Sequence, residues 1–235
     1  MRIDFKKICR DFNLGRLEDI AEIKKGLINK KYLLSTSENK FVLRISLRRA
    51  AKDLKFEVDL LNHLKNLPTP QLIKNKNSGY IGRVGENPFI IYRYISGQTV
   101  KNISMDLIRQ LALFQAEFHR QGERFISRVK REPNYNLPPA KVQRMSKLIE
   151  KKFKGESLKK FQEIKKEILA IRLPKNLPEG PIHVDIKPEN TIIRSGKIKG
   201  ILDFDNSYRG TLLVDIGKTL MWYCTENKKL NKNCF

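Results

Sequence analysis

The sequence contains little cysteine, histidine or tryptophan, with 3, 3 and 1 residues among 235. Cys9, Cys224 and Cys234 are odd in number, and none of them lies in a CxxC spacing. This pattern argues against a disulfide framework and against a cysteine-based zinc site. We therefore expect a protein of a reducing compartment, namely the cytoplasm.

Long apolar runs are also missing. No run approaches the length needed to cross a bilayer, and Asp215 interrupts the best candidate near the end of the chain. The first residues, Met1–Phe12, carry charges and lack the apolar core of a secretory signal. The sequence accordingly predicts a soluble protein without a membrane partner.

Acidic residues are scarce relative to basic ones, with 25 Asp and Glu against 48 Lys and Arg, for a formal net charge of +23. Such a charge attracts phosphates on a nucleotide, on a nucleic acid or on a membrane surface. A general excess of lysine on solvated surfaces would give the same total. The charge alone therefore does not choose a partner.

Apolar spacing divides the chain into a strand-rich first part and a helical second part. A short helix or approach segment is expected over Leu17–Lys25. Strands are expected at Tyr32–Ser35, Phe41–Ile45, Tyr80–Arg83, Pro88–Ile95, Thr191–Ile193 and Ile198–Leu202. Helices are expected at Arg49–Lys65, Met105–Arg120, Lys141–Ile171 (one or two) and from Leu213 onward. This order predicts an α+β fold with a boundary near Ser96–Gly97.

The most informative stretch is His-Val-Asp-Ile-Lys-Pro-Glu-Asn at residues 183–190, followed downstream by an apolar run that leads to Asp203. Pro188 forbids a continuous helix and places Asp185 and Asn190 in one turn. Together with Asp203 they offer three oxygen-bearing groups, which suit Mg²⁺. A carboxylate not on the metal could accept a hydroxyl proton. These are the parts of a kinase catalytic loop.

The motif resembles the aminoglycoside phosphotransferase and choline kinase superfamily, and most closely the homoserine kinases within it. Leu177–His183, and residues 200–204 running without gaps to Leu212–Asp215, carry this closer resemblance. The resemblance implies a two-lobed protein-kinase-like fold. An antiparallel β N-terminal lobe with one helix would span residues 1–96, and a mainly helical catalytic lobe residues 97–235. It also implies ATP and Mg²⁺ as cofactors and a small-molecule hydroxyl, first of all homoserine, as acceptor.

The same resemblance assigns roles around the catalytic loop. Asp185 would be the base, or would orient the attacking hydroxyl, while Asn190 and Asp203 would hold magnesium. His183 would pack under the loop, and Asp215 would accept its backbone hydrogen bonds. His119 matches a common family position and is expected to be structural, whereas Lys187 departs from most small-molecule members and resembles the protein-kinase sequence. Lys187 could neutralise charge on the γ-phosphate, with a solvated loop lysine as the alternative.

The nucleotide would be bound by the first lobe. A glycine lets backbone amides approach a phosphate closely, although a Gly and an Asn in a hairpin often mean only a turn. An arginine stands where the family has its phosphate-binding lysine; it keeps the charge and is followed by an acidic partner on the next helix. The hinge backbone would contact adenine, or form an ordinary edge strand. The residues assigned in this way are Gly26, Asn29, Arg44, Glu57, Tyr94 and Ile95.

Other hypotheses stay open. Asp205 is acidic, as in many aminoglycoside-type members, where homoserine kinases have an aromatic residue; this departure favours an aminoglycoside- or choline-type kinase. Lys187 resembles protein kinases, but residues 203–215 are too short for a polypeptide docking platform. Relatives usually continue beyond the segment matching Leu213–Cys224 with helices that cover the substrate pocket. The sequence therefore names no substrate-specific residue and leaves the oligomeric state open.

A catalytically weak kinase-fold protein that binds nucleic acid is the last alternative. Basic residues are dense between Arg120 and Lys175, but aromatic residues do not alternate with them as base stacking would require. The apolar residues of this region are expected to face inward; they are Leu148, Phe153, Leu158, Phe161, Ile164 and Ile168.

Overall fold

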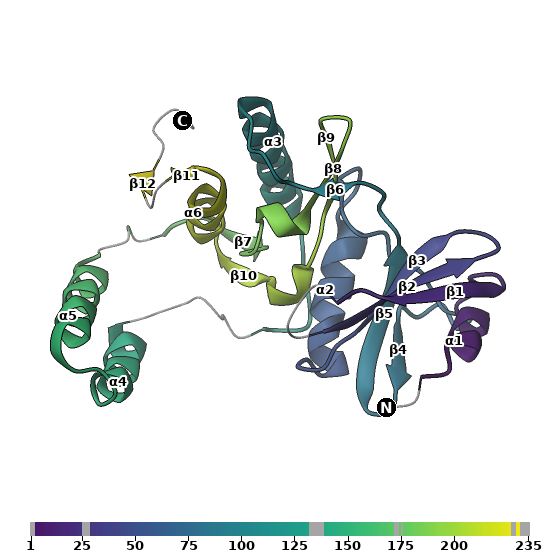
Figure 1. The fold of residues 1–235 in the computed structure, drawn as a ribbon, viewed down its shortest axis with the longest axis horizontal. Helices are drawn as coiled ribbons and strands as arrows, with labels where there is room; N and C mark the ends of the chain where they lie inside the picture. The colour runs from purple at the N-terminus through teal and green to yellow at the C-terminus, as the bar shows by residue number, and fades with distance from the viewer. Residues whose placement is uncertain are drawn as a thin grey trace. The chain divides into compact units, whose positions relative to one another are not determined.

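The computed structural model describes residues 3–24, 29–131, 139–171, 174, 176–226 and 229–230. The chain divides into two compact units, residues 1–132 together with 178–235, and residues 133–177. Figure 1 shows the elements of both units. Within the described ranges, none of the helices is long and apolar enough to span a bilayer.

A five-stranded antiparallel sheet opens the larger unit, with the strand order β1-β2-β3-β5-β4 (Figure 1). The elements of this part are α1 (Phe5–Asp11), β1 (Leu17–Glu22), β2 (Lys30–Thr36), β3 (Lys40–Ile45), α2 (Ala51–His63), β4 (Ile81–Val84) and β5 (Asn87–Arg93). Strand β2 pairs with β3, and β4 pairs with β5. The first four predicted strands and the helix predicted at Arg49–Lys65 are therefore confirmed.

Side-chain alternation gives this sheet two different faces. On β3, Leu43 shares a buried cluster with Ile8 of α1. Its neighbour Val42 shares another cluster with Leu54 of α2. Arg44 lies two residues after Val42, so it faces the α2 side of the sheet. This alternation decides which charged side chains can meet below.

The prediction for Leu17–Lys25 was wrong over its first six residues, because Leu17–Glu22 forms strand β1. Ala21 pairs with Leu33 of β2 in an antiparallel register. Most of the β1 side chains are exposed, so the segment lacks the alternating apolar pattern that identifies a strand. The pairing with β2 makes this segment a strand, although its composition favours a helix.

The second part of the larger unit combines two helices with short strands. Its elements are β6 (Gln98–Thr99), α3 (Met105–Gly122), β7 (Glu179–Ile182), β8 (Thr191–Arg194), β9 (Lys197–Ile201), β10 (Tyr208–Thr211), α6 (Leu212–Tyr223), β11 (Thr225–Glu226) and β12 (Lys229–Leu230). The predicted helices near Met105 and Leu213 and the two predicted β runs are confirmed. Strands β7 and β10, which pair with each other, were not predicted.

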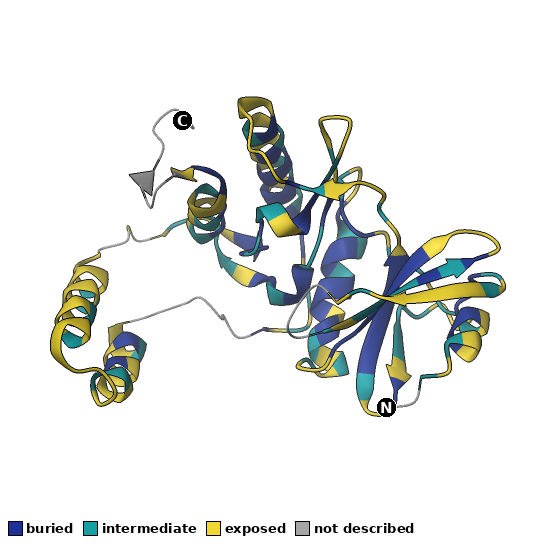
Figure 2. Cartoon of the chain, viewed as in Figure 1, coloured by how far each residue is buried: buried dark blue, intermediate teal, exposed yellow. Residues whose placement is uncertain are grey.

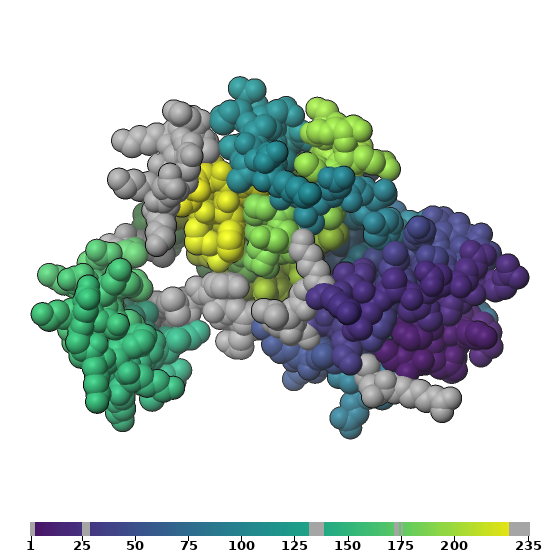
Figure 3. All heavy atoms as spheres, in the orientation of Figure 1, coloured from purple at the N-terminus to yellow at the C-terminus, as the bar shows by residue number. Residues whose placement is uncertain are grey.

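The β8–β9 hairpin lies against α3, as the space-filling view shows (Figure 3). Gln110 of α3 binds the hairpin through both the nitrogen and the oxygen of its side-chain amide. Its Nε2 donates to the carbonyl of Gly196 at 2.9 Å, and its Oε1 accepts from the backbone N–H of Ile198 at 3.0 Å. The hairpin is thereby fixed directly before the segment that carries Asp203.

The predicted lobe boundary near Ser96–Gly97 falls between β5 and β6. Gly97 has a φ of 152°, and a Cβ there would lie 2.6 Å from the carbonyl oxygen of Ile193, so only glycine fits. Helix α2 nevertheless shares one buried cluster with the second part, in which Leu60 lies with Phe118 and Phe204. The division into residues 1–96 and 97–235 stays a prediction.

The smaller unit is a helical hairpin of α4 (Pro139–Glu150) and α5 (Gly155–Ala170). The rings of Phe153 and Phe161 meet with centroids 5.9 Å apart. The expectation that its apolar residues face inward was wrong for four of them: Leu148, Phe153, Ile164 and Ile168 are 62%, 43%, 47% and 36% exposed. Two helices cover only one stripe of each other, which leaves much of α5 exposed (Figure 2).

Candidate active site

The predicted catalytic loop begins at the end of β7, and Asp215 of α6 binds its backbone. Oδ1 of Asp215 accepts the backbone N–H groups of His183 at 3.1 Å and of Val184 at 2.7 Å. Val184 has a φ of 61°, which is uncommon for a β-branched residue. The two hydrogen bonds hold this turn, which is the contact that the role predicted for Asp215 requires.

The second oxygen of Asp215 meets His119 from the last turn of α3, at 2.9 Å. Both residues are buried. Burial by itself raises the pKa of the Asp215 carboxyl, but the hydrogen bonds from His119 and from the backbone of Val184 outweigh it, so the pKa lies below its usual value. Asp215 is thus a buried carboxylate with a partner on each oxygen.

The His183 ring connects the predicted catalytic loop to the strand before Asp203. Its Nδ1 accepts the backbone N–H of Asp185 at 3.2 Å, and its Nε2 lies 3.0 Å from the carbonyl of Leu202. Because a backbone N–H can only donate, Nδ1 must be unprotonated and Nε2 carries the proton. The ring also packs edge-on against Phe204, with centroids 4.3 Å apart.

Asp185, Lys187 and Asn190 meet in one group. The amide nitrogen of Asn190 donates to Oδ2 of Asp185 at 3.0 Å and to its backbone carbonyl at 2.9 Å. The ammonium of Lys187 lies 3.0 Å from the same Oδ2. Lys187 also lies over the ring of Trp222 of α6, 5.8 Å from its centroid. Trp222 was not predicted, although it is the only tryptophan of the chain.

Asp203 follows β9 in the left-handed conformation, with φ 69° and ψ 58°. Such a conformation costs a non-glycine residue about 1–3 kcal/mol and is common at functional sites. The carboxylate lies 3.3 Å from the ammonium of Lys31 and 3.8 Å from a guanidinium nitrogen of Arg44. Burial alone raises the pKa of Asp203, but these two cations outweigh it and lower the pKa.

Arg44 and Glu57 form a buried ion pair between β3 and α2. Nη2 of Arg44 lies 2.6 Å from Oε2 of Glu57, and each side chain is 3% exposed. Burial alone lowers the pKa of the Arg44 guanidinium, but Glu57, its hydrogen bond and Asp203 raise the pKa above its usual value. The pair that the sequence predicted is therefore present, and it lies on the α2 face of the sheet.

Replacing Glu57 with alanine is expected to destabilise the fold by about 3–5 kcal/mol, because it leaves the buried Arg44 charge without its nearest carboxylate. The measurement is the free energy of unfolding from urea titration. Asp59→Ala is the matched control on the same helix: its pair with Lys55 is 2.7 Å long but 27% and 55% exposed, so about 1 kcal/mol or less is expected. Equal losses in both variants would contradict the prediction.

The structure gives less direct evidence on the other residues that were predicted to bind the nucleotide. Gly26 lies outside the described residues. The amide of Asn29 reaches Oδ2 of Asp205 at 3.5 Å. The backbone N–H of Tyr94 donates to the carbonyl of Lys40 at 3.0 Å, so an adenine contact at Tyr94 would have to use the backbone carbonyl of Tyr94. Ile95 packs over Gly200, where a Cβ would lie 2.7 Å from the Ile95 Cδ1.

Arg131 is a buried residue of this region that the sequence did not single out. Its guanidinium donates to the backbone carbonyls of Asp205 at 3.0 Å and of Ser207 at 2.7 Å, and also to that of Asp53 of α2 at 2.6 Å. Burial lowers the pKa of Arg131 to about 10. Arg131 therefore ties the segment after Asp203 to α2, although no local pattern marks it.

The oxygen donors near Asp203 fit a magnesium ion. The backbone N–H of Leu202 donates to the carbonyl of Asn190 at 2.8 Å, so the two loops are joined directly beside both predicted ligands. The amide nitrogen of Asn190 donates to Asp185. The amide oxygen of Asn190 therefore points away from that carboxylate, and it is the atom that would bind the ion. Among the residues that the structure describes, no three His, Cys, Asp or Glu side chains cluster. Mg²⁺ does not need them, because it is usually held by one or two carboxylates, waters and phosphates.

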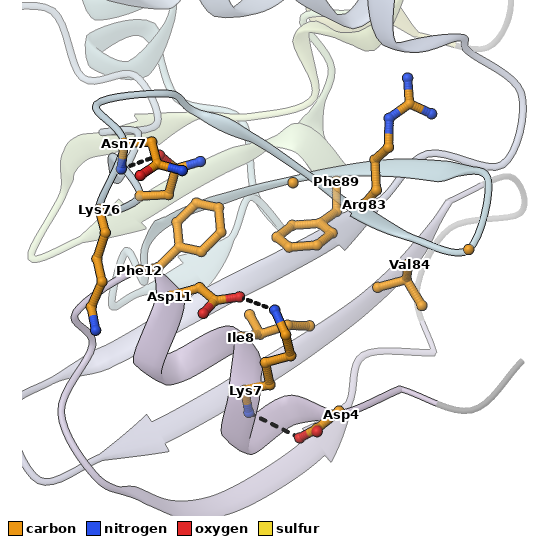
Figure 4. Close-up of a pocket in the computed structure, with 13 residues that line it drawn as sticks. Asp4, Lys7, Ile8, Asp11, Phe12, Lys76, Asn77, Arg83, Val84 and Phe89 are labelled. Atoms are coloured by element: carbon orange, nitrogen blue, oxygen red, sulfur yellow. Dashed lines mark hydrogen bonds and ion pairs between the residues drawn. The ribbon is translucent and has the colours of Figure 1, made fainter.

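A hollow of about 590 Å³ lies elsewhere on the sheet, on the α1 side (Figure 4). Phe12 and Phe89 meet in it with ring centroids 5.4 Å apart, and Lys7 and Asp11 lie at its edge. Arg44 and Glu57 face the other side of the sheet. This hollow is therefore separate from the group of residues around Asp203.

The chain matches the model of the phosphotransferase enzyme family (APH) over residues 19–230. It is 26% identical over 231 residues to a homoserine kinase from Rhodopseudomonas palustris (strain BisA53), covering 95% of this chain and 69% of that protein. The comparison therefore supports the homoserine-kinase resemblance over nearly the whole chain.

The fold is shared with solved structures, among them two with a TM-score of 0.69. One is amicoumacin kinase hAmiN in complex with AMP-PNP, Ca²⁺ and Ami, with a TM-score of 0.69 and 16% identity over 92% of this chain and 67% of that one. The other is the GDP and kanamycin complex of APH(2")-IIia, with a TM-score of 0.69 and 22% identity over 93% and 77%. The predicted α+β, kinase-like fold is confirmed.

Proposed function

Because the chain belongs to the phosphotransferase enzyme family, whose model covers residues 19–230, we propose that it transfers the γ-phosphate of ATP to a hydroxyl group of a small molecule. One observation carries this proposal: Asn190 binds the Asp185 carboxylate with its side chain and the residue before Asp203 with its backbone. This arrangement supports a base and a metal ligand at one site, which phosphoryl transfer requires.

In the proposed reaction the hydroxyl oxygen of the acceptor attacks the γ-phosphorus, and the bond to the β–γ bridging oxygen breaks. ADP leaves, and the hydroxyl proton passes to the Asp185 carboxylate. Asn190 and Lys187 both contact Oδ2 of Asp185, so they orient this carboxylate. The Lys187 ammonium also offsets negative charge next to the transferred group.

Asn190 and Asp203 would hold Mg²⁺, and their oxygens are the hard donors that this ion prefers. When bound, the ion supplies positive charge to the phosphate oxygens. His183 and Asp215 act on the backbone: the first links the catalytic loop to Leu202, and the second binds the turn before Asp185. They are positioning residues in this proposal.

Homoserine is the acceptor that we propose to test first. The similarity to a homoserine kinase, at 26% identity over 95% of this chain, supports it. The acidic Asp205 instead supports an aminoglycoside- or choline-type acceptor. Its side chain is 4% exposed and lies within ion-pair distance of Arg48 at 3.3 Å and Arg49 at 3.7 Å. These contacts give Asp205 a structural role whichever acceptor is used.

A panel that measures ADP release against homoserine, choline, aminoglycosides, sugars and hydroxylysine tests the acceptor. We expect kcat/KM for homoserine to exceed that for the other compounds by about 10²-fold or more, since a compound whose size or polar groups do not match the site leaves buried polar groups of the site unpaired. The negative control is 2-aminobutyrate, which is homoserine without its hydroxyl group. Turnover of an aminoglycoside but not of homoserine would replace the acceptor and leave the kinase assignment standing.

Nucleic acid binding is the second candidate function. The observation in its favour is the exposure of Lys151, Lys152, Lys159, Lys160 and Lys166 on the helical hairpin. Binding through such contacts would fall steeply as salt rises. Salt-dependent RNA or DNA binding by a protein that releases no ADP with any acceptor would favour this candidate over the kinase.

A further inference from the structure

We infer that Lys31 of β2 is a second cation, beside Arg44 of β3, that contacts the nucleotide phosphates; this rests on the proposed function. The sequence directed attention to β3 alone, because the family's lysine lies there. The structure brings a second cation from the neighbouring strand to the same carboxylate, Asp203.

Strand register places Lys31 on the same face as Arg44. The two residues are Cα partners in the antiparallel β2–β3 pair, and partners across such a pair project to the same side of the sheet. That side faces α2 and Asp203. Lys30 is the partner of Ile45, which is buried in the cluster on the α1 side. The two adjacent lysines therefore project to opposite faces.

Arg44 is the less accessible of the two cations. Its guanidinium is buried against Glu57 at 2.6 Å, with each side chain 3% exposed. The pair uses Nη2 of Arg44, and the guanidinium has further N–H donors, so Arg44 can keep Glu57 while it faces a phosphate. Arg44 also holds α2 against the sheet and adds positive charge near Asp203, 3.8 Å away.

Lys31 is more accessible than Arg44. Its side chain is 18% exposed, and its ammonium lies 3.3 Å from Oδ2 of Asp203. An ammonium has three donors on a flexible stem, so it can keep Asp203 and still donate to a phosphate oxygen. The predicted magnesium ligand and the phosphate-contacting cation are thus neighbours, as a bound Mg·ATP requires.

The test compares Lys31→Met with Lys30→Met, its neighbour on the opposite face, and with Lys31→Arg, which keeps the charge. Calorimetry with Mg²⁺ and AMP-PNP measures phosphate contact, and titration with adenosine measures binding without phosphates. We expect Lys31→Met to weaken AMP-PNP binding by about 10- to 100-fold, the worth of a hydrogen bond between charged groups. Adenosine binding should stay unchanged, Lys31→Arg should recover most of the loss, and Lys30→Met should match the parent protein.

Each other outcome has a definite meaning. Equal AMP-PNP binding by Lys31→Met and the parent protein would overturn the inference alone. An equal loss for adenosine and AMP-PNP, or a lowered melting temperature, would show that Lys31 supports the fold and does not contact phosphate. A parent protein that binds no nucleotide would overturn the proposed function and this inference with it.

Discussion

Asp185→Asn is expected to lower kcat by about 10²- to 10⁴-fold, the usual contribution of a general base. The variant keeps the shape of the side chain but removes the carboxylate that would take the hydroxyl proton. The interactions with Asn190 at 3.0 Å and with Lys187 at 3.0 Å would also weaken. AMP-PNP binding should change little, since Asp185 acts on the acceptor. The measurement is ADP release with the best acceptor of the panel, beside calorimetry with AMP-PNP.

Glu189→Gln is the matched control for this prediction. Glu189 lies in the same loop, is exposed and carries the same charge, so its loss should leave kcat within about twofold, as is usual for surface substitutions. A variant of Asp185 that turns over at the rate of Glu189→Gln would remove the assignment of the base. Loss of both turnover and AMP-PNP binding would point instead to a distorted loop.

Asp203→Asn is expected to lower kcat/KM by about 10³-fold at a fixed Mg²⁺ concentration, because metal charge on phosphate oxygens contributes several kcal/mol to the transition state. Part of this loss should be recovered as Mg²⁺ is raised. The measurement is a Mg²⁺ titration of ADP release. It is paired with AMP-PNP binding in Mg²⁺ and in EDTA, since Asp203 also contacts Lys31 and Arg44.

The two binding conditions separate these roles. If Asp203 holds the ion, the variant should lose the extra affinity that Mg²⁺ gives the parent protein and match the parent in EDTA. Asp19→Asn, an exposed carboxylate of β1, controls for the loss of one negative charge. A Mg²⁺ dependence in Asp203→Asn identical to that of the parent protein would exclude the ligand role.

Local patterns were sufficient where neighbours in sequence make the structure. The helix α3 follows from its apolar spacing and begins with Ser104, whose side chain accepts from the backbone N–H of Leu107 at 3.2 Å. The turn from Asp185 to Asn190 closes over five residues and contains Pro188. Such features predict an element and its loop because each contact spans only a few residues.

Local sequence patterns failed where contacts between distant segments determine the structure. Strand β1 has the composition of a helix, and its pairing with β2 settles its structure. His119 and Asp215 lie on different helices, 96 residues apart in sequence. Arg131 reaches carbonyls of α2 and of the segment after Asp203, at sequence separations of 78 and 74. Nothing in the residues next to Arg131 indicates either contact.

The sequence by itself determined helices α2, α3 and α6, the strand pairs β2–β3 and β4–β5, the turn from Asp185 to Asn190 and the groups proposed to hold a metal and a phosphate. Only the tertiary structure decided which cation meets which carboxylate: Arg44 is buried with Glu57, and Lys31 reaches Asp203 across a separation of 172 residues. The reason is strand register. A shift of β2 by one residue would turn Lys31 to the α1 side and bring Lys30 to Asp203, and a register is set by packing and hydrogen bonds between strands rather than by any one segment.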